Sequence, residues 1–135
     1  MRYDIAIIGT GPAGISAAIT AKLRNKNIIL FGNKDLSDKI NKDNSIKHYT
    51  GLPNVTGEEL ATALKNHLND LDIEITEKRV NAVYSMGEYF ALQVGKEMIE
   101  SKSLIIATGV TASKTLENED EFLGRGVSYC ATCDA

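Results

Sequence analysis

Two cysteines close to the end of the chain are the residues best suited to covalent chemistry. Cys130 and Cys133 enclose Ala131-Thr132 and are followed directly by Asp134. Thiols at this spacing can close a small disulfide, in which one thiolate attacks a partner and the other resolves the mixed disulfide. A neighbouring carboxylate can exchange a proton with the thiolate that forms. The pattern therefore indicates a redox-active disulfide with an acid–base group beside it.

Two other interpretations of the cysteine pair remain open. A closed zinc site needs four ligands, and the other candidates, His48 and His67, are far from the pair and in no ligand spacing, so no metal site is predicted. Two unpaired thiols near a frayed chain end would do no chemistry. The chain has only these two cysteines, which excludes the disulfide framework of a small secreted protein.

A glycine-rich loop near the start of the chain is the second feature with chemical potential. It reads Gly9-Thr10-Gly11-Pro12-Ala13-Gly14 and lies between an apolar run and an alanine-rich segment. At a junction of strand and helix, the first glycine permits a sharp turn, the second a close approach to a pyrophosphate, and the third close packing of helix on strand. The N–H groups at the helix start then face the phosphates. The loop predicts dinucleotide binding, with an ordinary glycine-rich turn as the alternative.

The segments around this loop are typical of a βαβ unit. The apolar run Ile5-Ala6-Ile7-Ile8 predicts a buried strand over about Tyr3 to Ile8, and Pro12 suits the first turn of the helix that follows. Ile28 to Phe31 predicts a second, parallel strand. The long polar stretch from Gly32 to Thr50 is expected to be a loop with at most one helical turn, and loops of this length are usually functional.

Beyond this loop, the sequence predicts a helix, a meander and a further parallel strand. Thr56 to Glu59 has the form of a capping box, and leucines then recur every three or four residues from Leu60 to Leu71. Ile73 to Ile75 alternates as a short strand. Three antiparallel strands and a separate parallel strand are then expected over Val80–Tyr84, Tyr89–Val94, Glu97–Ser101 and Leu104–Ala107, in that order.

The composition fits one domain and argues against two classes of partner. The 135 residues suffice for one domain with an adequate core. The 15 basic and 18 acidic residues give a net charge of −3 and form no basic stripe, so no nucleic-acid partner is expected. No apolar run approaches the roughly 18 residues of a membrane span, and Asp4 and the glycine loop interrupt any signal peptide. The protein is therefore expected to be cytoplasmic, without a membrane partner.

The two chemical motifs together resemble those of the low-molecular-weight thioredoxin reductases. The resemblance runs from about residue 3 to the end of the chain, and it is carried by the glycine loop and by Gly124-Arg125-Gly126-Val127-Ser128-Tyr129 leading into Cys-Ala-Thr-Cys-Asp. It implies an α/β fold, namely a three-layer FAD/NAD(P)-binding Rossmann-like domain with a parallel sheet and a three-stranded antiparallel meander. Residues 1–112 would be the first segment of the FAD-binding domain, and residues 113–135 a linker and the start of the redox domain.

The same resemblance implies roles for individual residues. Cys133 would face the flavin of FAD, Cys130 would exchange with thioredoxin, and Asp134 would be the acid–base group. Electrons would pass from reduced FAD to this disulfide and on to thioredoxin, with ferredoxin or NADPH as the donor and a homodimer as the full-length assembly. The residues expected to bind FAD are Gly9, Gly11, Pro12, Ala13, Gly14, Gly32, Asn33, His48, Val80 through its backbone, Ala107, Thr108 and Gly109.

The chain departs from the family pattern after the second strand and in its length. The fingerprint expects an acid about 20 residues past the glycines to bind the ribose, but Leu30-Phe31-Gly32 offers none, so backbone after Gly32 is expected to bind it. His48 takes the place of an asparagine near the flavin, with an ordinary surface histidine as the alternative. These changes resemble the clostridial branch, which takes electrons from ferredoxin.

Family members continue for about as many residues again, so the chain is expected to be an N-terminal fragment. Two other functions stay open. One is a nucleotide-binding or electron-transfer module without disulfide chemistry. The other is a folding unit whose cofactor groove is empty.

Overall fold

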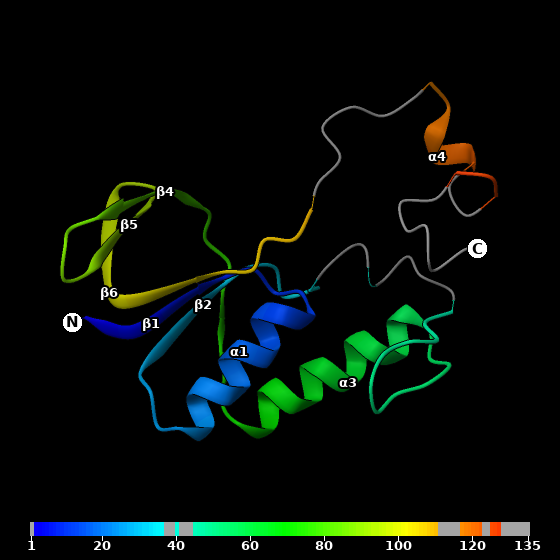
Figure 1. The fold of residues 1–135 in the computed structure, drawn as a ribbon, viewed down its shortest axis with the longest axis horizontal. Coiled ribbons are helices and arrows are strands. Elements are labelled where there is room, and N and C mark those ends of the chain that lie inside the picture. Colours follow the sequence, from blue (N-terminus) through cyan, green and yellow to red (C-terminus); the bar gives the residue numbers. More distant parts are fainter. Residues whose placement is uncertain (1, 37–39, 41–44, 111–116, 123–124, 128–135) are drawn as a thin grey trace.

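The computed structural model describes residues 2–36, 40, 45–110, 117–122 and 125–127 of the chain. In chain order, the elements are β1 (Tyr3–Ile8), α1 (Pro12–Leu23), β2 (Ile28–Phe31), α3 (Gly57–Asp70), β3 (Ile75–Thr76), β4 (Val80–Ser85), β5 (Phe90–Val94), β6 (Glu97–Ile106) and α4 (Glu119–Phe122). The described strands form one six-stranded mixed sheet in the order β3-β2-β1-β6-β5-β4 (Figure 1).

The first three elements form the predicted βαβ unit. β1 and β2 run parallel, with Ile5 opposite Ile28 and Ile7 opposite Leu30. β2 and the Ile5–Ile8 part of β1 are continuous apolar runs, as is typical of parallel strands that are covered on both faces. Pro12 occupies the first turn of α1, where its missing N–H has no intrahelical partner to lose. The βαβ prediction is confirmed.

The helix α3 begins at the predicted capping box. The Thr56 hydroxyl accepts the Glu59 N–H at 3.2 Å, and the Glu59 carboxylate accepts the Thr56 N–H at 2.8 Å. The bond from the Thr56 backbone, and then that from its hydroxyl, lower the pKa of the Glu59 carboxyl. Leu60, Leu64 and Leu68 are buried along one stripe. Because of this stripe, α3 packs beside α1 over the same face of the sheet (Figure 1).

The short strand after α3 lies later than the sequence pattern predicts. The alternation places it at Ile73 to Ile75, whereas β3 spans Ile75–Thr76 and pairs in parallel with the end of β2. Ile73 is buried in the core on the helix side, and its N–H donates to the Leu68 carbonyl oxygen at 3.0 Å. Ile73 is therefore part of the turn that ends α3, and it is not part of β3.

The largest correction concerns β6. The sequence predicts two strands, over Glu97–Ser101 and Leu104–Ala107, but the structure has one strand of 10 residues, Glu97–Ile106. Its first half pairs antiparallel with β5, and its second half pairs in parallel with β1. The run Ser101-Lys102-Ser103 interrupts the apolar pattern, yet Ser101 is fully buried where it stands between residues of β1 and β5. The meander and the parallel sheet are therefore continuous through a single strand.

Two hydrophobic cores give the domain three layers. α1 and α3 cover one face of the parallel strands, and β4 and β5 fold over the other face (Figure 1). The helix-side core contains Ile7, Ile15 and Leu30, and the meander-side core contains Phe31 and Leu92. The predicted α/β class, with three layers, a parallel sheet and an antiparallel meander, is confirmed.

The region predicted to be a linker contains the short helix α4. It spans only 4 residues, and Phe122 in it is about half exposed. The boundary at residue 112 remains a prediction, because residues 111–116 lie outside the described part of the chain. Across the described ranges, no helix is long and apolar enough to cross a membrane.

Candidate functional site

A cleft lies where the carboxyl ends of the parallel strands meet. β1, β2 and β6 end side by side there, next to the start of α1 (Figure 1). Ligands of open α/β sheets bind at this edge. The cleft has a volume of about 910 Å³, which is within the range of small-molecule sites.

Three walls enclose the cleft. The glycine wall consists of the loop after β1 and the segment after β6, and its lining residues are Ile8 to Ala13 and Ala107 to Val110. The loop wall consists of the segment between β2 and α3 with the start of α3, and its lining residues are Leu36, Ile40, Ile46, His48, Tyr49 and Leu60. The connector is the segment between β3 and β4, which contributes Lys78, Arg79 and Val80, while Phe31 and Gly32 come from the end of β2.

Two glycines of the glycine wall are required by the packing of the chain itself. A Cβ atom at Gly9 would collide with the Ala107 carbonyl oxygen, and the φ of Gly9, +120°, disfavours any other residue. A Cβ atom at Gly14 would collide with the Gly9 carbonyl oxygen. The two glycines therefore hold β1, α1 and the segment after β6 close together. Gly14 is buried and does not line the cleft.

Gly11, in contrast, has no neighbour that requires a glycine. Its backbone is extended, with φ −78° and ψ 179°, which any residue adopts. A Cβ atom there would meet nothing within 4 Å, although Gly11 lines the cleft. The first turn of α1, which is described in full, has no side-chain cap and no acidic residue, so the Ala13 and Gly14 N–H groups are open to an anion. These features fit a pyrophosphate that approaches the backbone at Gly11.

Thr10 connects the glycine wall to the end of β2, a role that the sequence analysis missed. Its hydroxyl donates to the Asn33 carbonyl oxygen at 3.1 Å and accepts the Asn33 N–H at 3.0 Å. Only 5% of Thr10 is exposed, and a Cβ atom at Gly32 would collide with its side chain. Thr10 occupies a variable position of the fingerprint, so the spacing of the motif gives no signal for it.

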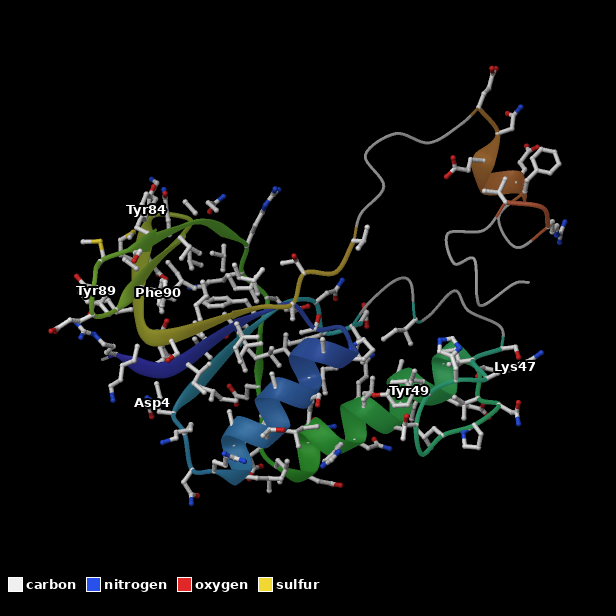
Figure 2. The ribbon with its side chains drawn as sticks, in the orientation of Figure 1. Asp4, Lys47, Tyr49, Tyr84, Tyr89 and Phe90 are labelled. Atoms are coloured by element: carbon white, nitrogen blue, oxygen red, sulfur yellow. The ribbon has the colours of Figure 1, made fainter. Side chains whose placement is uncertain are left out.

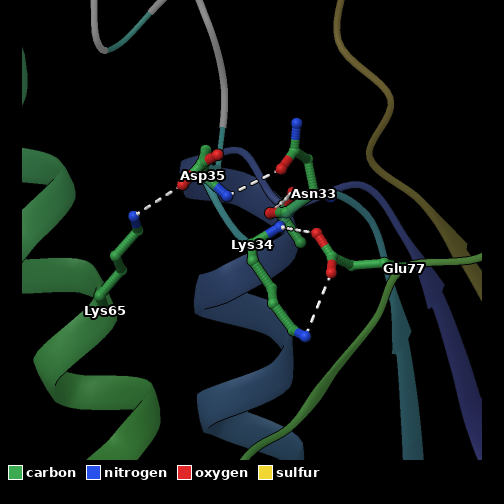
Figure 3. A network of polar contacts seen from close by, with 6 residues as sticks. Asn33, Lys34, Asp35, Lys65 and Glu77 are labelled. Atoms are coloured by element: carbon green, nitrogen blue, oxygen red, sulfur yellow. Dashed lines mark hydrogen bonds and ion pairs between the residues drawn. The ribbon is translucent and has the colours of Figure 1, made fainter.

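The backbone N–H groups that follow β2 are all engaged within the chain. From Gly32 to Asp35 they donate, in order, to the Thr76 carbonyl oxygen, the Thr10 hydroxyl, the Glu77 carboxylate and the Asn33 side-chain oxygen. Figure 3 shows the bonds of Lys34 and Asp35 in this network together with the ion pairs Lys34–Glu77, at 3.1 Å, and Lys65–Asp35, at 3.4 Å. None of these N–H groups is left to bind a ribose hydroxyl, and Asn33 does not line the cleft.

The same network sets the charge of Glu77. The Lys34 backbone N–H is the largest cause that lowers the pKa of the Glu77 carboxyl, and the Lys34 side chain is the second. The carboxylate is therefore ionised at neutral pH and holds the segment after β2 against the connector.

The loop wall is apolar where the sequence pattern indicates only a polar loop. A bridge between Ile46 and Val55, with N–O distances of 2.7 and 3.2 Å, anchors this wall. His48 and Tyr49 follow and line the cleft, and Figure 2 shows Tyr49 beside the first turns of α3. Three apolar side chains from the segment between β2 and α3 are buried in this wall: Leu36, Ile40 and Ile46. They were missed because they are isolated among polar residues and show no periodicity.

The connector supplies Lys78 and Arg79, and within the described part of the chain no acidic side chain lines the cleft. The Lys78 ammonium pairs with Glu97 at 2.9 Å. The sequence analysis placed only the backbone of Val80 here and missed its two basic neighbours. The cleft is therefore electropositive in a chain whose net charge is −3, which favours an anionic ligand.

The structure brings most of the predicted cofactor-binding residues to this cleft, and their individual roles toward FAD remain predictions. Cys130, Cys133 and Asp134 lie outside the described residues, so their chemistry also remains a prediction. Among the residues that are described, no group of three or more His, Cys, Asp or Glu side chains could hold a metal ion. The predicted residues that line the cleft are Gly9, Gly11, Pro12, Ala13, Gly32, His48, Val80, Ala107, Thr108 and Gly109.

The three-layer fold and the open glycine loop together define a dinucleotide-binding domain of the Rossmann-like class. The family model described as pyridine nucleotide-disulphide oxidoreductase matches residues 3–135. The chain therefore belongs to the pyridine nucleotide-disulphide oxidoreductase family.

Individual relatives narrow the resemblance within that family. The thioredoxin reductase of Mycoplasma genitalium is 37% identical over 135 residues, which cover 98% of this chain and 43% of the relative. A solved ferredoxin-flavin thioredoxin reductase from Clostridium acetobutylicum is 56% identical, with a TM-score of 0.82 over 99% of this chain and 47% of that one. The solved thioredoxin reductase from Streptococcus pyogenes is 32% identical, with a TM-score of 0.86 over 98% of this chain and 44% of that one.

These comparisons confirm the resemblance to thioredoxin reductases and point to an FAD-binding fold, as the sequence predicts. The chain spans less than half of the length of each of these relatives.

Proposed function

We propose that the full-length protein containing this chain is a flavin-dependent thioredoxin-disulfide reductase. The observation that carries the proposal is the opening at Gly11, where the chain leaves room for a ligand against the backbone beside an uncapped helix start. The names of the relatives and the Cys-Ala-Thr-Cys-Asp sequence support the disulfide chemistry.

The residues of the cleft fit FAD. The backbone at Gly11 and the Ala13 N–H would bind the pyrophosphate at the start of α1, where Pro12 fixes the first turn. The buried apolar side chains of the loop wall would exclude water from the other half of the cofactor. When bound and reduced by the electron donor, FAD would supply the two electrons that reduce a disulfide.

The cysteines would carry these electrons to the substrate. Two electrons and two protons convert the Cys130–Cys133 disulfide into two thiols. The Cys130 thiolate then attacks the thioredoxin disulfide and forms a mixed disulfide, which Cys133 resolves. The products are dithiol thioredoxin and the restored Cys130–Cys133 disulfide. Asp134 would exchange the proton of the attacking thiol.

The electron donor proposed here is ferredoxin, with NADPH as the alternative. The relative at 56% identity is named a ferredoxin-flavin thioredoxin reductase, whereas the Streptococcus pyogenes thioredoxin reductase is 32% identical. We further propose a cytoplasmic location and a homodimeric assembly for the full-length protein.

Turnover with purified components tests the proposal. The full-length protein loaded with FAD should reduce thioredoxin when reduced ferredoxin is supplied, or otherwise with NADPH. The Cys133→Ser variant should lose turnover and keep the flavin absorbance, because the Cys133 thiol takes part in electron transfer and not in cofactor binding. Absence of turnover with both donors would contradict the proposal.

Thiol titration separates this function from an electron-transfer module without disulfide chemistry. After anaerobic reduction of the bound flavin with excess donor, two new thiols per chain are expected, because one disulfide opens. No new thiols would favour the module.

A further inference from the structure

The connector between β3 and β4 places side chains in the cleft to which the dinucleotide fingerprint gives no role. We propose that Arg79 binds the adenosine diphosphate half of the cofactor, and that this contact makes the cleft prefer a dinucleotide flavin to a mononucleotide flavin. The proposal rests on the proposed function, because it concerns the same cleft. The ligand class is a nucleoside diphosphate.

Arg79 is the cationic side chain of the cleft whose charge is still available. Lys78 is paired with Glu97 at 2.9 Å, whereas Arg79 makes no ion pair or hydrogen bond in the described structure. Arg79 also lines a smaller groove of about 360 Å³ next to the cleft, which it shares with Lys78 and Lys96. Three cations against one acid make this end of the cleft attractive to an anion.

The segment after β2, where the dinucleotide fingerprint expects the ribose to bind, has no free backbone N–H group for the ribose hydroxyls in the described structure. Among the described residues, no acid after β2 lines the cleft. The N–H groups from Gly32 to Asp35 all donate within the chain, as Figure 3 shows for Lys34 and Asp35. Two acids in this part of the described structure, Asp35 and Glu77, form ion pairs with Lys65 and Lys34, respectively. Recognition of the adenosine half must therefore come from another part of the cleft, and Arg79 on the connector offers a cationic donor that is not paired within the described structure.

The backbone on both sides of Arg79 is fixed, so its side chain extends from a stable base. Val80 begins β4 and stands opposite Val94 on β5. The Gly95 N–H donates to the Asn81 side-chain oxygen at 3.0 Å, which ties the β5–β6 turn to the start of β4. On the other side, the Lys78–Glu97 pair links the connector to β6.

The chemistry of the guanidinium suits this ligand. It presents several N–H donors in a planar fork that can bind phosphate oxygens in pairs, and its plane can stack on an adenine ring. FMN lacks the adenosine monophosphate half and would miss this contact. The loss expected on removing one such charge-assisted contact is about tenfold in affinity.

Calorimetric titration of the cofactor-free full-length protein with FAD, ADP and FMN tests the proposal. Arg79→Gln should lower the affinity for FAD and for ADP by about tenfold and leave the affinity for FMN unchanged. The affinities of Arg79→Lys for FAD and ADP should lie between those of Arg79→Gln and the wild type. The matched control is Arg24→Gln, because Arg24 is an exposed arginine just after α1, at the end opposite the cleft. It should bind all three ligands like the wild type.

Two results would overturn the proposal. One is an affinity of Arg79→Gln for FAD and ADP equal to that of Arg24→Gln. The other is an equal loss for FMN, which would place Arg79 at the part shared by both flavins. The ADP titration keeps the two proposals apart. Binding of ADP that depends on Arg79, without any binding of FAD, would support Arg79 and contradict the proposed function. Absence of binding for all three ligands would contradict both.

Discussion

The glycine wall and the segment after β2 both border the cleft, but they are built in different ways. In the glycine wall, missing side chains let backbones touch at Gly9 and Gly14 and leave an opening at Gly11. After β2, side chains from distant parts of the chain form hydrogen bonds with the backbone, as the Thr10 hydroxyl does with the N–H and the carbonyl oxygen of Asn33. A wall made of backbone is encoded in the spacing of one short motif, whereas a wall made of side chains depends on partners distant in the chain.

Gly14→Ala is expected to cause the largest loss of stability. Alanine favours a helix over glycine by up to about 1 kcal/mol, but its Cβ would collide with the Gly9 carbonyl oxygen, and overpacking costs about 1–3 kcal/mol or more. Because the colliding atom is backbone, the clash should prevail, with a net loss of about 2 kcal/mol in the free energy of unfolding. Urea denaturation of the full-length protein without FAD measures it. An unchanged stability would show that the glycine wall is not held by backbone contact.

Thr10→Val should have a smaller effect that tests the side-chain wall. The substitution keeps the shape of the side chain but removes the hydrogen bonds of its hydroxyl to the N–H and the carbonyl oxygen of Asn33, and the expected loss in the free energy of unfolding is about 1 kcal/mol. The control is Thr20→Val on the exposed face of α1, which removes one bond to the Ser16 carbonyl oxygen and should cost no more than about 0.5 kcal/mol. Equal losses in the two variants would contradict the connection that we assign to Thr10.

The smallest expected effect is the pH dependence of the Lys34–Glu77 contact. The Glu77 pKa is lowered in the folded state, so the contact stabilises the fold above the usual glutamate value of 4.5 and is lost as the pH falls through the folded pKa. The stability difference between wild type and Glu77→Gln should therefore be present near neutral pH and vanish in acid. The control Glu74→Gln, an exposed glutamate on the neighbouring turn, should show no such change. A difference that persists in acid would mean that the charge of Glu77 is not what holds the segment.

The parts of the fold and site that depend on local pattern could be predicted from the sequence. The βαβ unit follows from two apolar runs around the glycine loop, and the start of α3 follows from Thr56 and Glu59. The place of Gly11 at an open helix start was also predictable, because the motif itself positions it.

The parts that depend on distant partners could not be predicted. Thr10 and Asn33 are 23 positions apart, and Lys34 and Glu77 are 43 positions apart, so no motif links them. The continuity of β6 was hidden for a related reason. Ser101 is polar, but two neighbouring strands bury it, and only the paired sheet reveals this. Arg79 gave no signal because basic residues before a strand, such as the pair Lys78-Arg79, are common on protein surfaces.

The affinity of Gly11→Ala for FAD tests the central claim most directly. A Cβ atom at Gly11 meets no atom of the chain, so the free energy of unfolding should stay within about 0.5 kcal/mol of the wild type, in contrast to Gly14→Ala. The same Cβ would stand where a pyrophosphate must approach, so the full-length protein should bind FAD at least about tenfold more weakly. An unchanged affinity for FAD, or no binding of FAD by the wild type, would contradict the account.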